Sequence, residues 1–331
     1  MDVDPLPLVP LGDTGLTATP VGLGLAALGR PAYITIGRDR DLGPDRRVET
    51  MARRCHAMLD AAYDAGVRYV DAARSYGRAE EFLASWLAAR GLPPGAITVG
   101  SKWGYTYVGD WRLDAVTQEV KDHSRAAFTR QRDESLAVLG RHLSLYQVHS
   151  ATLESGVLED RALHRDLVAL AGTGVAVGLT VSGPAQAEVV RRALAVEVDG
   201  RSPFACVQAT WNLLEPSVGP ALAEAAGRGW GVLVKEALAN GRLTGAVPPP
   251  SALAQVAARH GAPVDQVALA AALAQDPVDV VLSGAVTEAQ LASNLTAPSA
   301  LELDADDLER LGALAEPPAR YWEERSRLAW A

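Results

Sequence analysis

Two kinds of hydrophobic pattern alternate along most of the chain. In the longer kind, apolar residues recur every three or four positions, as they do over residues 50–66, where Met51, Cys55 and Met58 share one face. Gly66 ends this segment, as a glycine in the left-handed conformation commonly ends a helix. Similar patterns predict helices over residues 80–91, 162–174 and 185–196. The shorter kind is almost continuously apolar and predicts eight strands, over residues 21–26, 68–73, 96–102, 145–150, 175–182, 204–211, 230–238 and 278–285.

The order of these segments predicts the fold. Each strand after the first follows a helical segment, and strands that are apolar throughout are typical of a parallel sheet covered on both faces. Eight such units in 331 residues predict one domain of the α/β class, a (β/α)8 (TIM) barrel spanning residues 1–331. A doubly wound sheet is the alternative, but "GLGLAALG" (22–29) lacks the G-x-G-x-x-G spacing of its phosphate-binding turn.

Segments outside the strand–helix units are predicted to lie at the two ends of the barrel. Residues 7–18 predict an N-terminal β-hairpin with its turn near Gly12, and this hairpin could close the bottom of the barrel. Residues 30–48 and 103–120 are long loops after the first and third strands. They belong on the C-terminal face, where long loops are commonly functional. Residues 317–331 form a C-terminal tail.

Composition and charge narrow the classes of partner. The net charge is −9 and no basic run occurs, which argues against nucleic acid or an anionic membrane surface as a partner. Cys55 and Cys206 have no metal-ligand spacing and form no disulfide framework, so we expect no metal site and a reducing compartment. The N-terminus lacks the pattern of a signal peptide, and no apolar run approaches ~18 residues. We therefore expect a cytoplasmic protein; no feature predicts its oligomeric state.

Polar residues stand where the predicted strands end. Asp71, Lys102 and His149 end three consecutive strands, and barrel strands direct such residues toward one central site. Taken singly, the Asp could cap a helix and the His could be structural. Lys102 is harder to explain in this way, because only three of the 31 basic residues are Lys and buried Lys is rare unless paired. The remaining strand ends carry Ser182, Gln208, Lys235 with Glu236, and Ser283.

These residue types together predict the acid half of a carbonyl reduction. Tyr76 lies five residues after Asp71, in the same loop. A Lys ammonium beside it is expected to lower the pKa of the Tyr76 phenol, with Asp71 holding the Lys. The tyrosine could then donate a proton to a carbonyl oxygen that His149 polarises. No side chain supplies a hydride, so a nicotinamide cofactor is required.

With these residues the chain resembles the aldo-keto reductase family, from about residue 10 to about residue 316. The family's Asp, Tyr-Gly and Glu pattern corresponds to Asp71, Tyr76, Gly77 and either Glu80 or Glu81. Its lysine on the third strand matches Lys102, and its histidine on the fourth strand matches His149. The resemblance implies that Tyr76 is the general acid/base, that Asp71 and Lys102 tune it, and that His149 positions the carbonyl.

The resemblance also implies a dinucleotide site along the later strands. The family's Ser-Asn pair on the fifth strand is only half present, as Ser182-Gly183, while its Gln and Asn on the sixth strand match Gln208 and Asn212. "ALANGRLTG" after the seventh strand is similar to the family's pyrophosphate loop, and "SGAVTEAQLASNL" to its adenine segment. The implied cofactor-binding residues are Gly24, Leu25, Ser182, Gln208, Lys235, Glu236, Leu238, Gly241, Leu243, Gly284, Gln290 and Asn294.

The chain departs from the family pattern in two places. Lys235 stands where many members place an aromatic ring against the nicotinamide; it either meets a phosphate or pairs with Glu236. Residues 284–298 contain no Lys or Arg, although a 2′-phosphate is usually met by a cation. The family prefers NADP(H), which is therefore the favoured cofactor, but this gap leaves NAD(H) open. Arg242 or Lys235 could supply the missing charge.

We therefore expect NAD(P)H-dependent interconversion of a small aldehyde or ketone and its alcohol. One alternative is a lyase that forms a Schiff base on Lys102. Another is a barrel that binds the cofactor and serves as a regulatory or interaction subunit without turnover. Aromatic residues in the long loops and the tail are candidates to line the substrate pocket or simply to pack, namely Tyr33, Trp103, Tyr105, and Tyr321 or Trp322.

Overall fold

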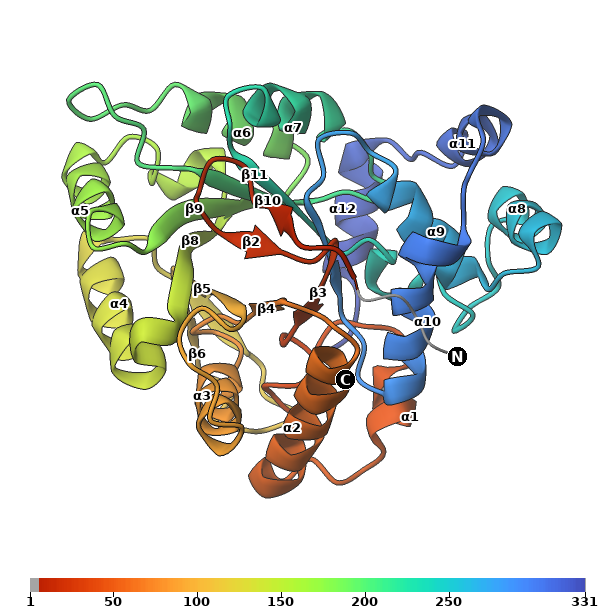
Figure 1. The fold of residues 1–331 in the computed structure, drawn as a ribbon, viewed down its shortest axis with the longest axis horizontal. Coiled ribbons are helices and arrows are strands. Elements are labelled where there is room, and N and C mark those ends of the chain that lie inside the picture. Colours follow the sequence, from red (N-terminus) through yellow and green to blue (C-terminus); the bar gives the residue numbers. More distant parts are fainter. Residues whose placement is uncertain (1–5, 331) are drawn as a thin grey trace.

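A closed barrel of eight parallel strands forms the centre of the protein in the computed structural model, which describes residues 6–330 (Figure 1). Residues 1–5 and 331 of the predicted domain and tail lie outside the described residues, as do the side chains of residues 298–300. All eight predicted strands are confirmed, with bounds that shift by a few residues. They are β3 (Val21–Gly24), β4 (Tyr69–Asp71), β5 (Thr98–Trp103), β8 (Leu143–Ala151), β9 (Ala176–Val181), β10 (Cys206–Thr210), β11 (Gly231–Lys235) and β12 (Val280–Ser283).

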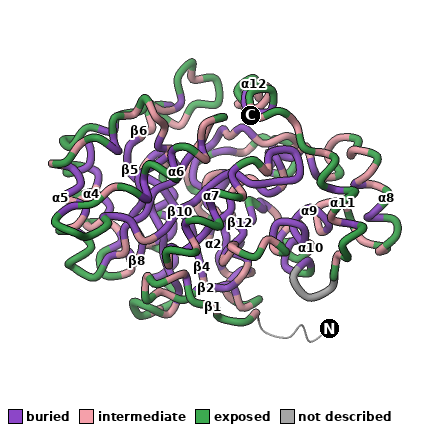
Figure 2. The backbone as a smooth tube through the Cα atoms, turned by 90° about the horizontal axis from the view of Figure 1, so that it is seen from above, coloured by how far each residue is buried: buried purple, intermediate pink, exposed green. Residues whose placement is uncertain are grey.

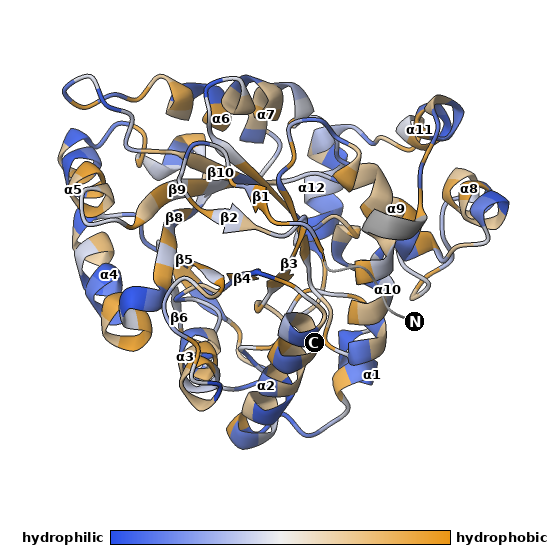
Figure 3. Cartoon of the chain, in the orientation of Figure 1, coloured by the Kyte–Doolittle hydropathy of each residue, from blue (hydrophilic) through white to orange (hydrophobic). Residues whose placement is uncertain are grey.

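Helices surround the barrel and turn their apolar faces toward it (Figure 3). Local sequence sets several of their ends: the side chain of Asp160 accepts hydrogen bonds from two amides at the start of one helix, and Ser124 caps another. Gly66 has a φ of +94° just beyond the first long helix, as its sequence predicts. The covering helices are α2 (Val48–Asp64), α3 (Ala79–Ala89), α4 (Arg125–Leu139), α5 (Arg161–Ala171), α6 (Gln186–Leu194), α7 (Gly219–Ala226), α8 (Ser251–His260), α9 (Val264–Leu273), α10 (Glu288–Ala300) and α11 (Ala305–Gly312).

The predicted N-terminal hairpin closes the bottom of the barrel. It pairs β1 (Val9–Pro10) with β2 (Thr17–Ala18), and both lie at the lower edge of Figure 2, opposite the C-terminal tail. Leu11 in the turn is fully buried and packs in the barrel with Tyr69 and Leu233. A side chain at Gly12 would overlap the backbone of Gly231, so this turn requires glycine.

The opposite end of the barrel carries the loops that were expected to be functional. Residues 30–48 contain the short helix α1 (Arg38–Leu42). Residues 103–120 were expected to be a loop, but they contribute to a second hairpin, in which β6 (Tyr105–Tyr107) pairs with β7 (Glu119–Lys121). The tail folds into α12 (Pro318–Ser326). In Figure 2 this helix lies at the same end of the molecule as the β6–β7 hairpin.

None of the helices formed by the described residues is long and apolar enough to cross a membrane. Both cysteines are buried and unpaired with each other, consistent with their apolar sequence context.

Candidate active site

The side chains of Asp71, Tyr76, Lys102 and His149 meet at the C-terminal end of the barrel. Asp71 ends β4, Lys102 lies near the end of β5, and His149 lies near the end of β8. The Lys102 ammonium is 1% exposed; it contacts the Asp71 carboxylate and lies 3.2 Å from the Tyr76 hydroxyl oxygen. The rings of Tyr76 and His149 meet edge to face, 5.5 Å between centroids. The four residues that the sequence singled out therefore share one site.

The electrostatics of this group differ from the sequence-based expectation in one respect. Burial, followed by the charge of Asp71, raises the pKa of Tyr76 well above its usual value, and the opposing effect of Arg30 is smaller. The expected lowering of this pKa by Lys102 is therefore wrong for the protein without ligands. The main reason is that burial disfavours the charged phenolate, and the carboxylate of Asp71 that pairs with the lysine disfavours it further. Tyr76 consequently carries its proton at neutral pH.

The other titratable members of the site are also shifted by burial. Burial lowers the pKa of Lys102, although the adjacent charge of Asp71 opposes this. Burial, together with the charges of Lys102 and Arg30, lowers the pKa of His149 well below its usual value. His149 is therefore neutral at pH 7 and can donate a hydrogen bond without carrying a charge. Its Nδ1 lies 3.3 Å from the hydroxyl of Ser75.

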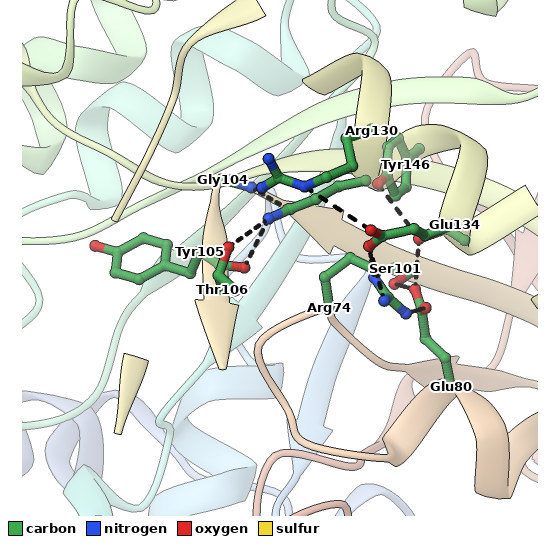
Figure 4. Close-up of polar contacts among 11 residues, drawn as sticks. Arg74, Glu80, Ser101, Gly104, Tyr105, Thr106, Arg130, Glu134 and Tyr146 are labelled. Atoms are coloured by element: carbon green, nitrogen blue, oxygen red, sulfur yellow. Dashed lines mark hydrogen bonds and ion pairs between the residues drawn. The ribbon is translucent and has the colours of Figure 1, made fainter. Parts of the chain in front are cut away.

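A buried polar network supports the loop that carries Tyr76, and Figure 4 shows Arg74, Glu80, Ser101 and Glu134 of this network. Glu80 is 2% exposed and accepts hydrogen bonds from Arg74 at 2.6 Å, Ser101 at 2.5 Å and Ser135 at 2.7 Å. Glu80, rather than the exposed Glu81, is thus the acidic residue that anchors this segment. Such fully bonded buried groups rigidify what they hold.

The wall next to Tyr76 is formed by residues that sequence reasoning partly missed. Tyr33 lines the cavity as expected, but beside it lies Arg30, whose guanidinium stacks on the rings of Tyr33, Tyr76 and Trp330 at 4.8 to 5.1 Å. Arg30 also forms a 2.8 Å ion pair with Glu119 of the β6–β7 hairpin. No local sequence signal marks Arg30, because arginine is the usual cation of this chain.

The other four aromatic candidates do not line the cavity. Trp103 is fully buried and packs against Phe128, because its side chain points from β5 toward the helices instead of the barrel axis. Tyr321 is 1% exposed, and its hydroxyl oxygen accepts a 2.9 Å hydrogen bond from the Asn212 amide. Trp322 also packs in the core. Tyr105 lies outside the lining, although its ring centroid is 5.0 Å from that of His149.

One cavity of about 790 Å³ runs from Tyr76 and His149 across the barrel end toward α10. This volume is typical of sites for cofactors and other small molecules. Leu25 and Leu243, two of the implied cofactor residues, are fully buried in the core, and Ser182 is half-buried outside the lining. The remaining implied cofactor residues do line it, namely Gly24, Gln208, Lys235, Glu236, Leu238, Gly241, Gly284, Gln290 and Asn294.

The shape and polarity of the cavity fit a dinucleotide. An added Cβ at Gly284 would meet no atom within 4 Å, so backbone is accessible at the end of β12. In the turn η3 (Ala239–Gly241), Asn240 adopts a φ of +53° and its buried side-chain oxygen has no hydrogen-bond partner, although the residue lines the cavity. A buried polar group left in this way is suited to bind a ligand.

Gln208 and Asn212 hold protein groups in place. The Gln208 amide donates to the Asp71 carboxylate at 3.0 Å, which links β10 to the cluster of Asp71, Tyr76, Lys102 and His149. Asn212 donates to the backbone oxygen of Glu236 at 3.0 Å and does not line the cavity.

The far end of the cavity carries charges of both signs. Asp41 and Asp265 line it, and the Gln290 amide donates to Asp41 at 2.6 Å. Arg38 and Arg40 line the cavity as well, and the Arg38 guanidinium donates to the backbone oxygens of Ala27, Arg30 and Pro31. Arg242 does not line the cavity, because its guanidinium is paired with Glu316 and Glu324.

At the catalytic end, Lys235 and Glu236 do not pair with each other. The Lys235 ammonium donates to the Thr210 hydroxyl at 2.7 Å. The Glu236 carboxylate is bound instead by Arg325 of α12, with one contact at 2.8 Å. The tail therefore reaches into the site through an ion pair that its sequence did not predict.

A TIM barrel with a buried Asp, Tyr, Lys and His group beside a dinucleotide-sized cavity defines an oxidoreductase of the aldo-keto reductase type, and the chain belongs to the aldo/keto reductase family, whose model matches residues 45–316. A protein from Pseudomonas aeruginosa described as an aldo-keto reductase is 27% identical and has a TM-score of 0.63, over 88% of this chain and 94% of the other. The holo form of an aldo-keto reductase from Bacillus halodurans, 22% identical, has the same fold, with a TM-score of 0.66 over 94% and 97%.

A curated relative with a named activity is also similar to part of the chain. Pyridoxal 4-dehydrogenase from Microbacterium luteolum is 30% identical over 161 residues. The match spans 42% of this chain and 42% of that relative, which is less than half of either protein.

Proposed function

We propose that the protein interconverts an aldehyde or ketone and the corresponding alcohol, using a nicotinamide dinucleotide. The observation that carries this proposal is the position of the Tyr76 hydroxyl, 3.2 Å from the Lys102 ammonium and beside a neutral His149, at one end of a cavity large enough for a dinucleotide. Membership of the aldo/keto reductase family supports the same reaction class.

Each catalytic side chain has a definable role in this reaction. Tyr76 is protonated at neutral pH and gives its proton to the substrate oxygen as negative charge develops there. His149 donates a hydrogen bond to that oxygen and orients the carbonyl. Lys102, kept charged by Asp71, stabilises the Tyr76 phenolate once the proton has left. When bound, the cofactor supplies the hydride for the carbonyl carbon.

The residues along the cavity would hold the dinucleotide. At Gly284 the side-chain position is open, so a ligand can approach the backbone there, and Gln290 and Asn294 lie at the end distant from Tyr76. The family preference for NADP(H) is opposed there by the carboxylates of Asp41 and Asp265. Carboxylates bind ribose hydroxyls and repel a 2′-phosphate. Of the two arginines that also line the cavity, Arg38 is already bound to backbone oxygens, which leaves Arg40 against two carboxylates, so we propose NAD(H) as the preferred cofactor.

The substrate end is suited to a small aromatic carbonyl compound. Tyr33, Trp330 and the Arg30 guanidinium form a wall beside Tyr76 that can stack on a flat ring. A partial similarity to pyridoxal 4-dehydrogenase, whose name specifies an aromatic substrate, agrees with this class.

The geometry disfavours the Schiff-base alternative. The Lys102 nitrogen already contacts Asp71, the backbone oxygen of Ala72 and Tyr76, which keeps it protonated and leaves no lone pair for attack on a carbonyl. The second alternative, a barrel that binds the cofactor without turnover, predicts cofactor binding but no reaction. Measurements of binding and of activity together distinguish it from the proposed enzyme.

Two measurements test the proposal. Tryptophan fluorescence should be quenched by NADH or NADPH at micromolar concentrations, since the chain contains seven Trp. Replacement of the proton donor in Tyr76→Phe should lower kcat by about 10²–10⁴-fold on a panel of carbonyl compounds while cofactor affinity stays the same. Tyr63→Phe, on α2 outside the cavity, is the matched control and should retain activity.

Contrary results would separate the alternatives. Activity of Tyr76→Phe within a few-fold of the wild type would exclude Tyr76 as the proton donor. Tight cofactor binding without turnover would favour the binding barrel. Failure to bind either dinucleotide would remove the reductase proposal, and borohydride trapping at Lys102 would then test the lyase.

A further inference from the structure

Lys235 is a cation at the catalytic end of the cavity that has no carboxylate partner among the described residues. The other three cations around this end are each in an ion pair: Arg30 with Glu119, Lys102 with Asp71, and Arg325 with Glu236. The half-buried ammonium of Lys235 lines the cavity and donates only to the neutral hydroxyl of Thr210, at 2.7 Å.

The Thr210 hydroxyl in turn donates to the Glu236 carboxylate at 3.3 Å, so Glu236 offsets part of the field of Lys235. Because four cations at this end face three carboxylates, one net positive charge remains beside the site. The fields of three close ion pairs fall off rapidly with distance, whereas the field of a single charge persists over several ångströms in a site shielded from water. The nearest ring is Trp322, 5.8 Å from the Lys235 nitrogen, and it provides only a weak cation–π contact. A ligand group placed next to Lys235 is therefore favoured when negative or neutral and disfavoured when positive.

The two redox states of a nicotinamide cofactor differ by this charge. The oxidised ring carries one positive charge and the reduced ring carries none, while the phosphates and sugars are identical. Hydride transfer to a substrate held by Tyr76 requires the ring at the Tyr76 end of the cavity, which is also the end that Lys235 lines.

Building on the proposed function, we propose that the ammonium of Lys235 discriminates between the redox states, favouring the reduced cofactor and weakening retention of the oxidised one. The site is then loaded with reduced cofactor even when the oxidised form is more abundant.

The test is equilibrium binding measured by fluorescence and calorimetry, without turnover. The probes are the reduced dinucleotide, the oxidised dinucleotide, and ADP-ribose, which has the pyrophosphate but no nicotinamide. The wild type should bind the reduced form about tenfold more tightly than the oxidised form, the order expected for one charge several ångströms away. Lys235→Met should bind the oxidised form about five- to tenfold more tightly than the wild type, with the affinities for the reduced form and ADP-ribose nearly unchanged.

Two further variants serve as controls. Lys235→Arg keeps the charge and should keep the preference for the reduced form. Lys121→Met removes a lysine that lies in β7 outside the cavity lining and should behave as the wild type.

A pH series adds an independent readout. Burial lowers the pKa of Lys235 to about 8, against the opposing charge of Glu236. The wild-type preference should therefore weaken above pH 8, whereas Lys235→Arg and Lys235→Met should each hold a constant ratio. Any pH dependence shared by all three proteins belongs to the other groups that face this end, namely Asp71, Lys102, His149, Glu236 and Arg325.

Specific outcomes would overturn the inference. An equal loss of affinity for all three probes in Lys235→Met would show that Lys235 binds the pyrophosphate. An unchanged ratio of oxidised to reduced affinity would show that Lys235 does not sense the ring. Failure of the wild type to bind either dinucleotide would remove the proposed function as well, so the two failures are distinguishable.

Discussion

The ion pair between Arg325 and Glu236 should be a major contribution of the C-terminal tail to stability. The Glu236 side chain is 8% exposed and that of Arg325 is 24% exposed, so water screens the pair only weakly. Burial alone would raise the pKa of Glu236, but the charges of Arg325 and Lys235 outweigh it and lower this pKa from 4.5 to about 2. At ~1.4 kcal/mol per pH unit, that difference corresponds to about 3 kcal/mol of stability at neutral pH.

Arg325→Gln should therefore lower the free energy of unfolding by about 2–3 kcal/mol, because Lys235 retains a share of the stabilisation and an unpaired buried carboxylate is left behind. The measurement is urea unfolding followed by tryptophan fluorescence at pH 7. Arg320→Gln on the same helix is the matched control. Its side chain is 66% exposed and its guanidinium is bound to Glu324, so its replacement should leave the urea midpoint close to that of the wild type.

The pH dependence follows from the sign of the shift. A carboxylate with a lowered pKa in the folded state stabilises the protein fully above its unfolded pKa, and this stabilisation is lost as the pH falls toward the folded pKa. The wild type should lose stability between pH 4.5 and about pH 2, and Arg325→Gln should lose less over the same interval. If Arg325→Gln and Arg320→Gln unfold at the same urea concentration at pH 7, the reasoning about this pair is wrong.

Two further predictions concern the aromatic core and the far end of the cavity. Trp103→Ala should destabilise the protein by about 3–5 kcal/mol in the same unfolding assay, because the ring is fully buried. The KM for carbonyl substrates should change little in the folded fraction. A large change in KM with normal stability would contradict the assignment of Trp103 to the core. At the far end, the wild type should bind NADH more tightly than NADPH by fluorescence titration. Asp41→Asn should improve NADPH affinity by about three- to tenfold without improving that of NADH, and equal effects on both would exclude a role at the 2′-position.

Much of the fold and the catalytic group could be predicted because the relevant signals are local. Each strand is a short apolar run between helical segments, and closure of eight strands into a barrel follows from their number and order. Asp71, Lys102 and His149 stand at strand ends, where the barrel geometry alone directs them to one place. Lys102 was further marked by the rarity of lysine in this chain.

The residues that sequence reasoning missed act through contacts between distant segments. Arg30 lies in the loop after β3, whereas Glu119 is the first residue of β7. Neither residue has a local sequence pattern that distinguishes it from a surface charge. Arg325 is likewise one of several arginines in the tail.

The error on the pKa of Tyr76 has a similar origin. The lysine beside the phenol and its pairing with Asp71 could both be predicted, but the depth at which the phenol is buried, which has the largest effect on its pKa, could not. The same limit applies to Trp103, because the direction of a side chain on a barrel strand depends on register.

The stacking of Trp330 on Arg30 joins the first loop of the barrel to the final described residue of the tail, across nearly the whole length of the chain. Contacts of such large sequence separation form late in folding, after the intervening units have been assembled. They are also among the first to open when part of a native structure fluctuates. The contacts of the tail with the open end of the cavity would then form after the barrel strands beneath them. Hydrogen exchange should accordingly find amides of α12 less protected than those of β4 and β5. Detachment of the tail would expose Tyr76 to water while leaving the barrel folded, so activity would be lost at lower denaturant concentrations than global structure.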